Sequence, residues 1–357
     1  MQPKKIFLES HNLKNRAGGL GTFNYELIKA LSKQSIEDLD IYLNSKHPKQ
    51  LSTKFGDKFN YQRYLSIHRH PFFYLKRKYD IWHSMNQNTK IEPYHTPKNY
   101  VLTVHDVNFV EEHSSDMNHR SNQLFIKKLE RADIITYISN FAKEQTHKYF
   151  KVPNVEEIII YNGNPITDFL NTENFISTVP VDKPFFYSIG DFIERKNFIS
   201  IIKMIKEMPD FNLIISGNND KAYGIEVKKF ITDNHLENKV FLTGKIDDIG
   251  KQFYMKNCIA FLFPSIREGF GLPPIEAMRF KKPVFLSTKT SLPEIGGEAA
   301  FYWEDFDPIY MKDIVLDKLS YFENNKALQQ EKLLERSLFF NWDKAASEYL
   351  NCYRKSF

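Results

Sequence analysis

Short apolar runs alternate with helical segments along the second half of the sequence, and this alternation restricts the fold more than any other feature. Five runs there have the length and composition of buried strands, at residues 185–189, 213–216, 240–243, 259–263 and 284–287. Helical patterns fill two of the intervals, at residues 221–235 and 246–257. Because parallel strands need a crossover of helix length between them, this alternation predicts a parallel sheet with helices packed on it.

The first half of the sequence repeats the pattern. Its predicted strands are residues 5–9, 41–43, 100–104, 134–139 and 158–161. A chain of 357 residues is also longer than one hydrophobic core usually supports. We therefore predict an α/β fold of two Rossmann-like domains. The expected division is residues 1–165, a proline-flanked linker at 166–183, residues 184–340, and a final helix within 341–357.

Composition limits the class of protein. Apolar residues make up 42% of the chain and charged residues 26%, as in soluble globular proteins. No apolar run is long enough to span a bilayer, and the short apolar stretch near the N-terminus does not fit a signal peptide. Cys258 and Cys352 have neither metal-ligand nor redox-motif spacing, so we expect reduced thiols in a cytoplasmic protein.

The loop after the predicted strand at 259–263 carries most of the chemistry, and it leads into a helix that opens on two prolines. Gly269 and Gly271 lack a Cβ, so backbone N–H groups there can approach a ligand. Glu268 precedes the loop and Glu276 lies in the expected first turn of the helix, so both carboxylates can reach one polar ligand. The alternative is a tight turn in which Glu276 only complements the helix dipole.

This segment resembles the signature of the family-4 retaining glycosyltransferases of GT-B fold, in which Gly-Phe-Gly-Leu-Pro lies between two glutamates. The resemblance covers nearly the whole chain. It implies two Rossmann-like domains that face each other across a cleft, with the final helix packed back towards the first. In that family the first glutamate and the loop amides hold the donor sugar, and the second glutamate holds the nucleotide ribose. The implied donor-binding residues are Glu268, Gly269, Phe270, Gly271, Leu272 and Glu276.

Two adjacent cations follow the first strand of the second domain. Arg195 and Lys196 lie between that strand and the next helix, where they can neutralise a diphosphate or simply be solvated. The family has a lysine at the Lys196 position, so the resemblance extends to this residue. Many members have an arginine where this chain has Asp191, and we expect Arg195 to supply that charge instead.

The resemblance implies further donor contacts. Gly19 and Gly21 belong to a glycine-rich turn that resembles the family loop under the donor diphosphate, although glycines there also permit close strand–helix packing. His105 ends the strand at 100–104, and the corresponding histidine of the family contacts the donor sugar. The turn formed by Gly244, Lys245 and Ile246 is expected to line the pocket for the nucleotide base.

No cofactor is predicted, because the nucleotide diphosphate sugar is itself a substrate. No metal site is predicted either. Asp38-Leu39-Asp40 matches the Asp-x-Asp pattern of the other large glycosyltransferase fold. It precedes a short strand, however, and a solvated turn is our interpretation. No other cluster of acidic residues or histidines has ligand spacing.

The net charge of +5 is concentrated in residues 46–80, which hold nine Lys or Arg against two Asp or Glu. Aromatic residues are interleaved with these cations: Phe55, Phe59, Tyr61, Tyr64, Phe72, Phe73, Tyr74 and Tyr79. Cations beside aromatics suit an anionic membrane surface better than single-stranded nucleic acid. The alternatives are a solvated face over core aromatics, or a site for the acceptor glycan. We expect peripheral attachment to the inner face of the cell membrane and no nucleic-acid partner.

These features predict an enzyme that transfers a hexose from a nucleotide diphosphate sugar to a glycan hydroxyl, with retention and without metal. By the resemblance, Arg195 and Lys196 stabilise the leaving diphosphate, while Glu268 and His105 position the sugar. The sequence is also similar to mannosyltransferases that use GDP-mannose to build lipid-linked O-antigen, capsule or lipopolysaccharide. UDP-hexoses and other GDP- or dTDP-sugars remain open as donors. A hydrolase, an epimerase or a non-catalytic sugar-nucleotide-binding subunit are the competing interpretations.

Overall fold

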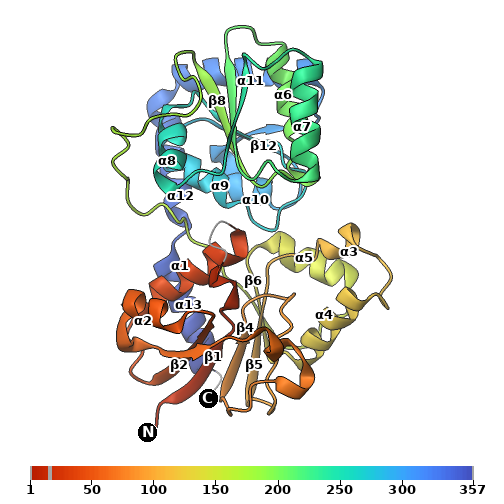
Figure 1. The fold of residues 1–357 in the computed structure, drawn as a ribbon, viewed down its shortest axis with the longest axis vertical. Coiled ribbons are helices and arrows are strands. Elements are labelled where there is room, and N and C mark those ends of the chain that lie inside the picture. Colours follow the sequence, from red (N-terminus) through yellow and green to blue (C-terminus); the bar gives the residue numbers. More distant parts are fainter. Residues whose placement is uncertain (1, 15–17, 356–357) are drawn as a thin grey trace. The chain divides into compact units, whose positions relative to one another are not determined.

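The computed structural model describes residues 2–14 and 18–355, and it divides into two compact units (Figure 1). Unit 1 comprises Met1–Pro165 and Asn341–Phe357, and unit 2 comprises Ile166–Phe340. Each unit contains a parallel sheet with helices packed on it. The predicted pair of Rossmann-like α/β domains is therefore confirmed.

The sheet of unit 2 contains six parallel strands in the order β10-β9-β8-β11-β12-β13. Their bounds are β8 Phe185–Ile189, β9 Asn212–Ser216, β10 Val240–Gly244, β11 Phe261–Phe263, β12 Val284–Ser287 and β13 Phe301–Trp303. Because a parallel sheet is covered on both faces, its inner strands are apolar almost throughout, and β9 and β11 are buried at every position. The strand order reverses between β8 and β11, and ligands bind at the carboxyl ends of such a switch point.

Helices cover both faces of this sheet. In Figure 1, α6 and α7 lie on one side of β8, and α8 lies on the other. The bounds are α6 Phe198–Lys206, α7 Ala222–Asp233, α8 Asp248–Asn257, α9 Leu272–Met278, α10 Leu292–Gly296, α11 Pro308–Asn324 and α12 Lys326–Phe339. The apolar face of α6 packs on β8 and β9 and against α11, and the buried Trp303 closes the same core.

The sheet of unit 1 contains seven parallel strands in the order β3-β2-β1-β4-β5-β6-β7. Their bounds are β1 Lys4–Leu8, β2 Leu39–Ser45, β3 Asn60–Arg63, β4 Ile81–Ser84, β5 Asn99–Val104, β6 Ile134–Tyr137 and β7 Glu156–Ile159. The strand order reverses between β1 and β4. The carboxyl ends of these two strands therefore form the switch point of this unit.

Helices of unit 1 also flank their sheet on both sides (Figure 1). The bounds are α1 Gly19–Lys33, α2 Pro48–Phe55, α3 Phe109–Glu112, α4 Arg120–Arg131, α5 Asn140–Tyr149 and α13 Trp342–Lys355. Although α13 follows unit 2 in the sequence, it packs along α1. Trp342 lies 5.8 Å from Phe23 between ring centroids, and the Tyr349 hydroxyl lies 3.2 Å from Thr103 Oγ1. The last helix thus completes the core of the first unit.

Three strands were absent from the sequence prediction, and each has a local reason. β3 is a polar edge strand without a fully buried position. β4 is buried but has only four residues and contains His83. β13 has three residues at the other sheet's edge. In the described parts of the chain, no helix combines the length and the apolar character that crossing a membrane requires.

Candidate active site

Arg195, Lys196 and Glu268 meet beside the switch point of unit 2. Lys196 Nζ lies 2.5 Å from Glu268 Oε1, and Arg195 Nη1 lies 3.0 Å from Glu268 Oε2. Ser265 Oγ donates a further hydrogen bond of 2.7 Å to Oε1. Glu268 is 8% exposed, as is Lys196, while the Arg195 side chain is 29% exposed. Both carboxylate oxygens are therefore engaged, and two cations surround one anion.

The local backbone explains how the two cations reach Glu268. Arg195 and Lys196 lie in the short 3-10 helix η5, Glu194–Lys196, which follows β8. Asn197 then takes a left-handed conformation, with φ 52°, and this turns the chain into α6. A Cβ on Gly190 would lie 3.1 Å from Lys196 Cε, so the glycine leaves room for the lysine side chain to cross the end of β8. The loop therefore directs both cations at Glu268, which follows β11, the neighbour of β8 in the sheet.

The charge states follow from burial and from the ion pairs. Burial raises the pKa of the Glu268 carboxyl, but Lys196 and Arg195 outweigh this effect and hold the pKa below its usual value. Burial lowers the pKa of the Lys196 ammonium, and although Glu268 raises it, Arg195 acts with burial, so the pKa stays below its usual value. Glu268 is thus firmly ionised, whereas Lys196 gives up its proton more readily than an exposed lysine.

Hydrogen bonds with Thr290 and Ser291 fix the glycine loop after Glu268. Ser291 Oγ donates to the carbonyls of Glu268, at 3.1 Å, and of Phe270, at 2.8 Å. The Glu268 N–H donates to Thr290 Oγ1 at 3.0 Å. Gly271 has φ 113°, a conformation that favours glycine, and it caps α9. The loop conformation is therefore set before any ligand arrives, and the predicted helix start on Pro273 and Pro274 is confirmed.

Glu276 forms a second ion pair, which the sequence did not indicate. Lys251 of α8 lies 3.0 Å from Glu276 Oε1, with Asp248 at 3.4 Å from the same ammonium. The Lys251 side chain is 17% exposed and that of Glu276 is 8% exposed. Because α9 begins at Leu272, Glu276 lies beyond the first turn, and the expected first-turn position is wrong. Its carboxylate is oriented by Lys251 rather than by the helix terminus.

The remaining predicted residues of unit 2 lie at two further strand ends. Gly244 ends β10 with φ 71° and has open space where a Cβ would stand, while Lys245 is exposed and Ile246 is half-buried. Asp191, which replaces the family's arginine, forms an exposed ion pair of 2.8 Å with Lys221. A cation thus stands beside Asp191 even though this position is acidic.

His105 belongs to unit 1, where it follows β5 and is 6% exposed. Its Nε2–H donates to the Met85 carbonyl at 2.9 Å, so the lone pair lies on Nδ1, and its backbone N–H donates to Gln87 at 3.0 Å. Burial lowers the pKa of His105 to about 4, despite the bond to Met85. Phe23 packs against the ring edge at 4.6 Å. His105 is therefore a neutral, fixed imidazole.

The glycines of the N-terminal turn fall inside the first turn of α1 rather than before it. Gly18 is the N-cap in extended conformation, and Gly19 and Gly21 are helical. No neighbouring atom lies within 4 Å of a Cβ built on Gly19, so the helix start is open there. The part of the turn at residues 15–17 lies outside the described residues.

The basic stretch of residues 46–80 divides into core and surface. All nine of its lysines and arginines are exposed. Phe55, Phe59, Tyr64 and Tyr79, in contrast, are buried, so half of the interleaved aromatics are core residues. The exposed apolar residues gather in and around η3 (Ser66–Arg69) and η4 (Pro71–Phe73), with exposed fractions of 44% for Leu65, 42% for Ile67, 88% for Phe72 and 50% for Phe73.

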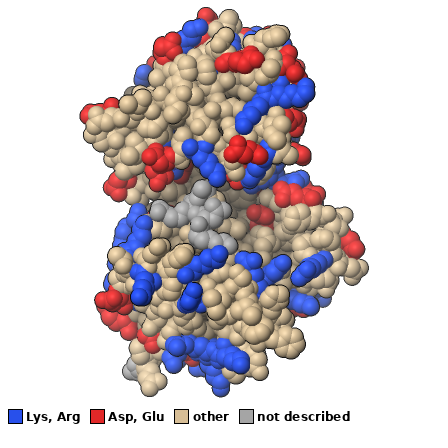
Figure 2. All heavy atoms as spheres, viewed as in Figure 1, with Lys and Arg blue, Asp and Glu red and all other residues tan. Residues whose placement is uncertain are grey.

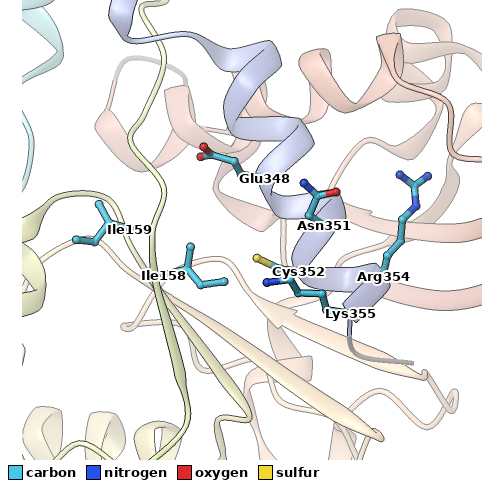
Figure 3. Close-up of a pocket in the computed structure, with 7 residues that line it drawn as sticks. All are labelled: Ile158, Ile159, Glu348, Asn351, Cys352, Arg354 and Lys355. Carbon is cyan, nitrogen blue, oxygen red and sulfur yellow. The ribbon is translucent and has the colours of Figure 1, made fainter.

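One open pocket of unit 1 contains none of the predicted site residues. Figure 3 shows it between two isoleucines of β7 and five residues of α13, among them Cys352 and Arg354. Arg354 forms an ion pair of 2.8 Å with Asp38, the first aspartate of the Asp-x-Asp pattern. Leu39 and Asp40 already belong to β2, so the turn interpreted there extends only to Asp38. In residues 2–14 and 18–355, no group of three or more His, Cys, Asp or Glu residues is arranged to hold a metal ion.

Sequence reasoning missed the residues that support the site. Ser265, Thr290, Ser291 and Lys251 carry no motif of their own, and each reaches the site only through a tertiary contact. Ser265 is the one that could have been found from the sequence, because it lies three residues before Glu268, just after a buried strand.

Known proteins match the whole chain in fold and both of its units in sequence. A solved structure with the same fold is Anabaena HepE in complex with UDP and glucose, with a TM-score of 0.73, 15% identity, and coverage of 99% of this chain and 100% of that one. Two family models match: "Glycosyltransferase Family 4" over residues 17–166 and "Glycosyl transferases group 1" over residues 171–305. The chain belongs to the glycosyltransferases that these two models define.

Curated relatives extend over different shares of the chain. The O-antigen chain mannosyltransferase B of Escherichia coli is 23% identical over 384 residues, which cover 98% of this chain and 99% of the relative. The O-antigen chain mannosyltransferase RfbU of Salmonella typhimurium is 27% identical over 208 residues, 57% of this chain and 56% of the relative.

Proposed function

We propose that this glycosyltransferase moves mannose from GDP-mannose to a hydroxyl of a growing, lipid-linked surface glycan, with retention at the anomeric carbon and without a metal ion. The proposed transfer chemistry is supported by the cluster of Arg195, Lys196 and Glu268. The choice of sugar and acceptor is supported by the similarity to two O-antigen mannosyltransferases.

The departing nucleotide diphosphate determines what the cluster must do. Negative charge grows on the β-phosphate as the glycosidic bond breaks, and preorganised donors aimed at it lower the barrier. Arg195 and Lys196 outnumber the single carboxylate between them, so the cluster keeps a net positive charge. Lys196 has three N–H donors, and contacts with Glu268 leave capacity for a phosphate oxygen. The loop amides after Glu268 would complete the phosphate and sugar contacts.

Retention can arise through a covalent intermediate or through attack from the front face. Glu268 is poorly suited as a nucleophile, because Lys196 and Ser265 occupy one of its oxygens and Arg195 the other. This favours front-face attack, in which the leaving phosphate helps to deprotonate the acceptor. Glu268 and His105 would then hold the donor sugar, and Glu276 would accept hydrogen bonds from the ribose.

The competing interpretations are separated by one assay. Purified protein is incubated with labelled GDP-mannose, UDP-glucose or dTDP-rhamnose together with a lipid-linked glycan extract. We expect label in the glycan with GDP-mannose, and NMR of the product should show the donor's anomeric configuration. Free sugar as the main product would indicate a hydrolase, and an altered donor sugar an epimerase. Binding without turnover would indicate a non-catalytic subunit.

We also propose that the η3–η4 segment docks unit 1 on an anionic membrane, where a lipid-linked acceptor is presented. Phe72 and Phe73 are exposed beside Arg69 and the cations Lys76, Arg77 and Lys78. Figure 2 shows several Lys and Arg side chains on the drawn face of unit 1. Each such cation contributes about 1 kcal/mol near an anionic surface, within a Debye length of about 8 Å.

The membrane proposal is tested by sedimentation with phosphatidylglycerol vesicles. We expect binding of the wild type at low salt, strong loss in the triple variant Lys76→Ser, Arg77→Ser and Lys78→Ser, and loss in Phe72→Ser. A matched control removes three other exposed cations of the stretch, at Lys49, Lys54 and Lys58, and should bind better than the first triple variant. Turnover on a short soluble acceptor should be unchanged. Wild-type protein that ignores these vesicles would overturn the proposal.

A further inference from the structure

Three polar residues meet at the switch point of unit 1 and have no part in the donor chemistry. Glu9 directly follows β1, His11 opens the 3-10 helix η1 (His11–Lys14), and Asn86 follows β4. The Glu9 carboxylate accepts from His11 Nδ1 and, at 3.3 Å, from the His11 backbone N–H on one oxygen. Asn86 Nδ2 donates to the other oxygen at 3.3 Å. Two neighbouring strand ends thus hold one histidine.

The hydrogen bond to Glu9 fixes the tautomer of His11. Because Nδ1–H donates to the carboxylate, the lone pair of the neutral imidazole lies on Nε2. Nε2 has no hydrogen-bond partner among residues 2–14 and 18–355. The Glu9 side chain is fully buried, whereas that of His11 keeps 9% exposure. A ligand at this edge would therefore touch His11, and Glu9 would act only through it.

Tyr64 adds a second observation that points to a ligand. It follows β3, and its ring centroid lies 5.3 Å from that of His11. Tyr64 is 2% exposed, and its hydroxyl has no hydrogen-bond partner within the described part of the chain. Buried hydroxyls are normally satisfied by protein, ligand or water. An imidazole nitrogen and an unpartnered hydroxyl on two neighbouring rings could each form a hydrogen bond with a sugar hydroxyl.

The charge of the site distinguishes between the two substrates. Glu9 forms no ion pair with a lysine or arginine in the described residues, and its only charged partner is His11 when protonated. A buried carboxylate without a cation disfavours an approaching diphosphate. A neutral polyol meets no such penalty. The chemistry therefore fits the acceptor rather than the nucleotide sugar.

We propose that His11, oriented by Glu9, binds a hydroxyl of the acceptor glycan through Nε2, with the Tyr64 ring beside it. This assignment rests on the proposed transfer to a glycan. His11 is an acceptor-binding residue, and Glu9 is a positioning residue. A purely structural pair would explain the bonds between Glu9, His11 and Asn86, but it would leave no use for the open Nε2 and the unpaired Tyr64 hydroxyl.

Binding is tested without turnover by ¹⁵N NMR of the whole protein labelled in its 11 histidines. His11 is assigned as the signal lost in His11→Gln. Titration with octyl glycosides of mannose, N-acetylglucosamine and galactose should move this signal for at least one sugar. The signal of exposed His113 should stay constant. No movement with any of the three would overturn the proposal.

Kinetics provide the second test. Removing one hydrogen bond in His11→Phe should raise the acceptor KM about threefold to tenfold, while the donor KM and the slow hydrolysis of donor by water stay unchanged. His11→Gln, whose amide can replace Nε2, should recover most of the loss, and Glu9→Gln should lie between them. Equal losses in transfer and in donor hydrolysis would refute acceptor binding.

Together, the two tests distinguish a failure of the proposed transfer from a failure of the proposed sugar site. If no nucleotide sugar supports turnover but an octyl glycoside still moves the His11 signal, the proposed transfer is wrong and the sugar site stands. If turnover is normal in His11→Phe and the NMR signal does not move, the transfer stands and the site is wrong.

Discussion

The two units have the same architecture, but the side chains at the carboxyl ends of their strands differ in charge. In unit 2 the edge is charged, with Glu268 between Arg195 and Lys196, and Glu276 against Lys251. In unit 1 the edge holds hydrogen-bonded groups such as the neutral His105, and the buried Glu9 carboxylate there has no lysine or arginine partner among the described residues.

The difference follows from what each edge is proposed to bind. A diphosphate needs cations that are already held in place, and the buried carboxylates of unit 2 hold them. A glycan is uncharged and is recognised by oriented donors and acceptors, which the fixed imidazoles of unit 1 provide. If this contrast is correct, charge changes in unit 2 should affect the donor alone.

The largest effect is expected for Lys196→Ala. Removing a preorganised donor from a developing charge costs about 10²–10³-fold in kcat. Lys203→Ala, at an exposed position on α6, is the matched control and should retain activity. Circular dichroism checks the fold, because Glu268 loses a partner in this variant. A kcat within twofold of wild type would remove Lys196 from the chemistry.

Glu276→Ala should weaken donor binding without changing the acceptor KM. A carboxylate that accepts ribose hydroxyls forms charge-assisted hydrogen bonds worth about 1.5–3 kcal/mol, which corresponds to about a tenfold to hundredfold loss. Calorimetry with GDP measures the change directly. Unchanged affinity in a folded variant would contradict the ribose role.

The pH dependence should be asymmetric. The Lys196 pKa lies below its ordinary value of 10.5, so the cation is lost as the pH rises through that lowered pKa, and kcat/KM for the donor should fall on the alkaline side. Glu268, with its pKa below 4.5, stays ionised well into the acid range. In Lys196→Arg the alkaline decline should move to higher pH. An unmoved decline would assign it to another group.

A smaller, more selective effect is expected for Lys251→Met. Without the ion pair, Glu276 loses its orientation, and GDP affinity should fall about threefold to tenfold. The affinity gap between GDP and its 2′- and 3′-deoxy analogues should shrink at the same time, because the contact with the ribose is what is lost. Lys256→Met, at an exposed position of α8, is the control. An unchanged gap would show that Lys251 acts elsewhere.

No effect is expected from metal removal. If Arg195, Lys196 and the loop amides stabilise the diphosphate, turnover should be the same with and without EDTA. Loss of turnover that added Mg²⁺ or Mn²⁺ restores would contradict this and would reopen Asp38-Leu39-Asp40 as a metal site.

The sequence predicted what is local and periodic. The strands from 185 to 287, the helix start at Pro273 and the parallel sheets all follow from short apolar runs and proline positions. The sequence did not show which aromatic residues of the basic stretch are exposed. Phe72 and Phe55 look alike in a sequence, although Phe72 is 88% exposed and Phe55 is a core residue. Exposure there depends on short 3-10 turns that have no periodic pattern.

Contacts between residues far apart in the sequence could not be predicted, for a different reason. Lys251 and Glu276 lie on separate helices, and Glu9 and Asn86 follow separate strands. Nothing in the local sequence of either partner marks the other. The identity of Glu276 was recognisable by resemblance, but the residue that orients it was not.

The position of α13 has a consequence for biosynthesis. Tyr349 and Tyr353 complete a core whose other members, such as Thr103 and His83, are made before the whole of unit 2. At about 5–20 residues per second, translation of residues 166–340 delays this completion by on the order of 10–30 s. Unit 2 is contiguous and can fold during that interval, whereas the first-synthesised unit emerges from the ribosome with its helix α1 uncovered. The core of unit 1 is therefore completed only by a helix that is made after the whole of unit 2.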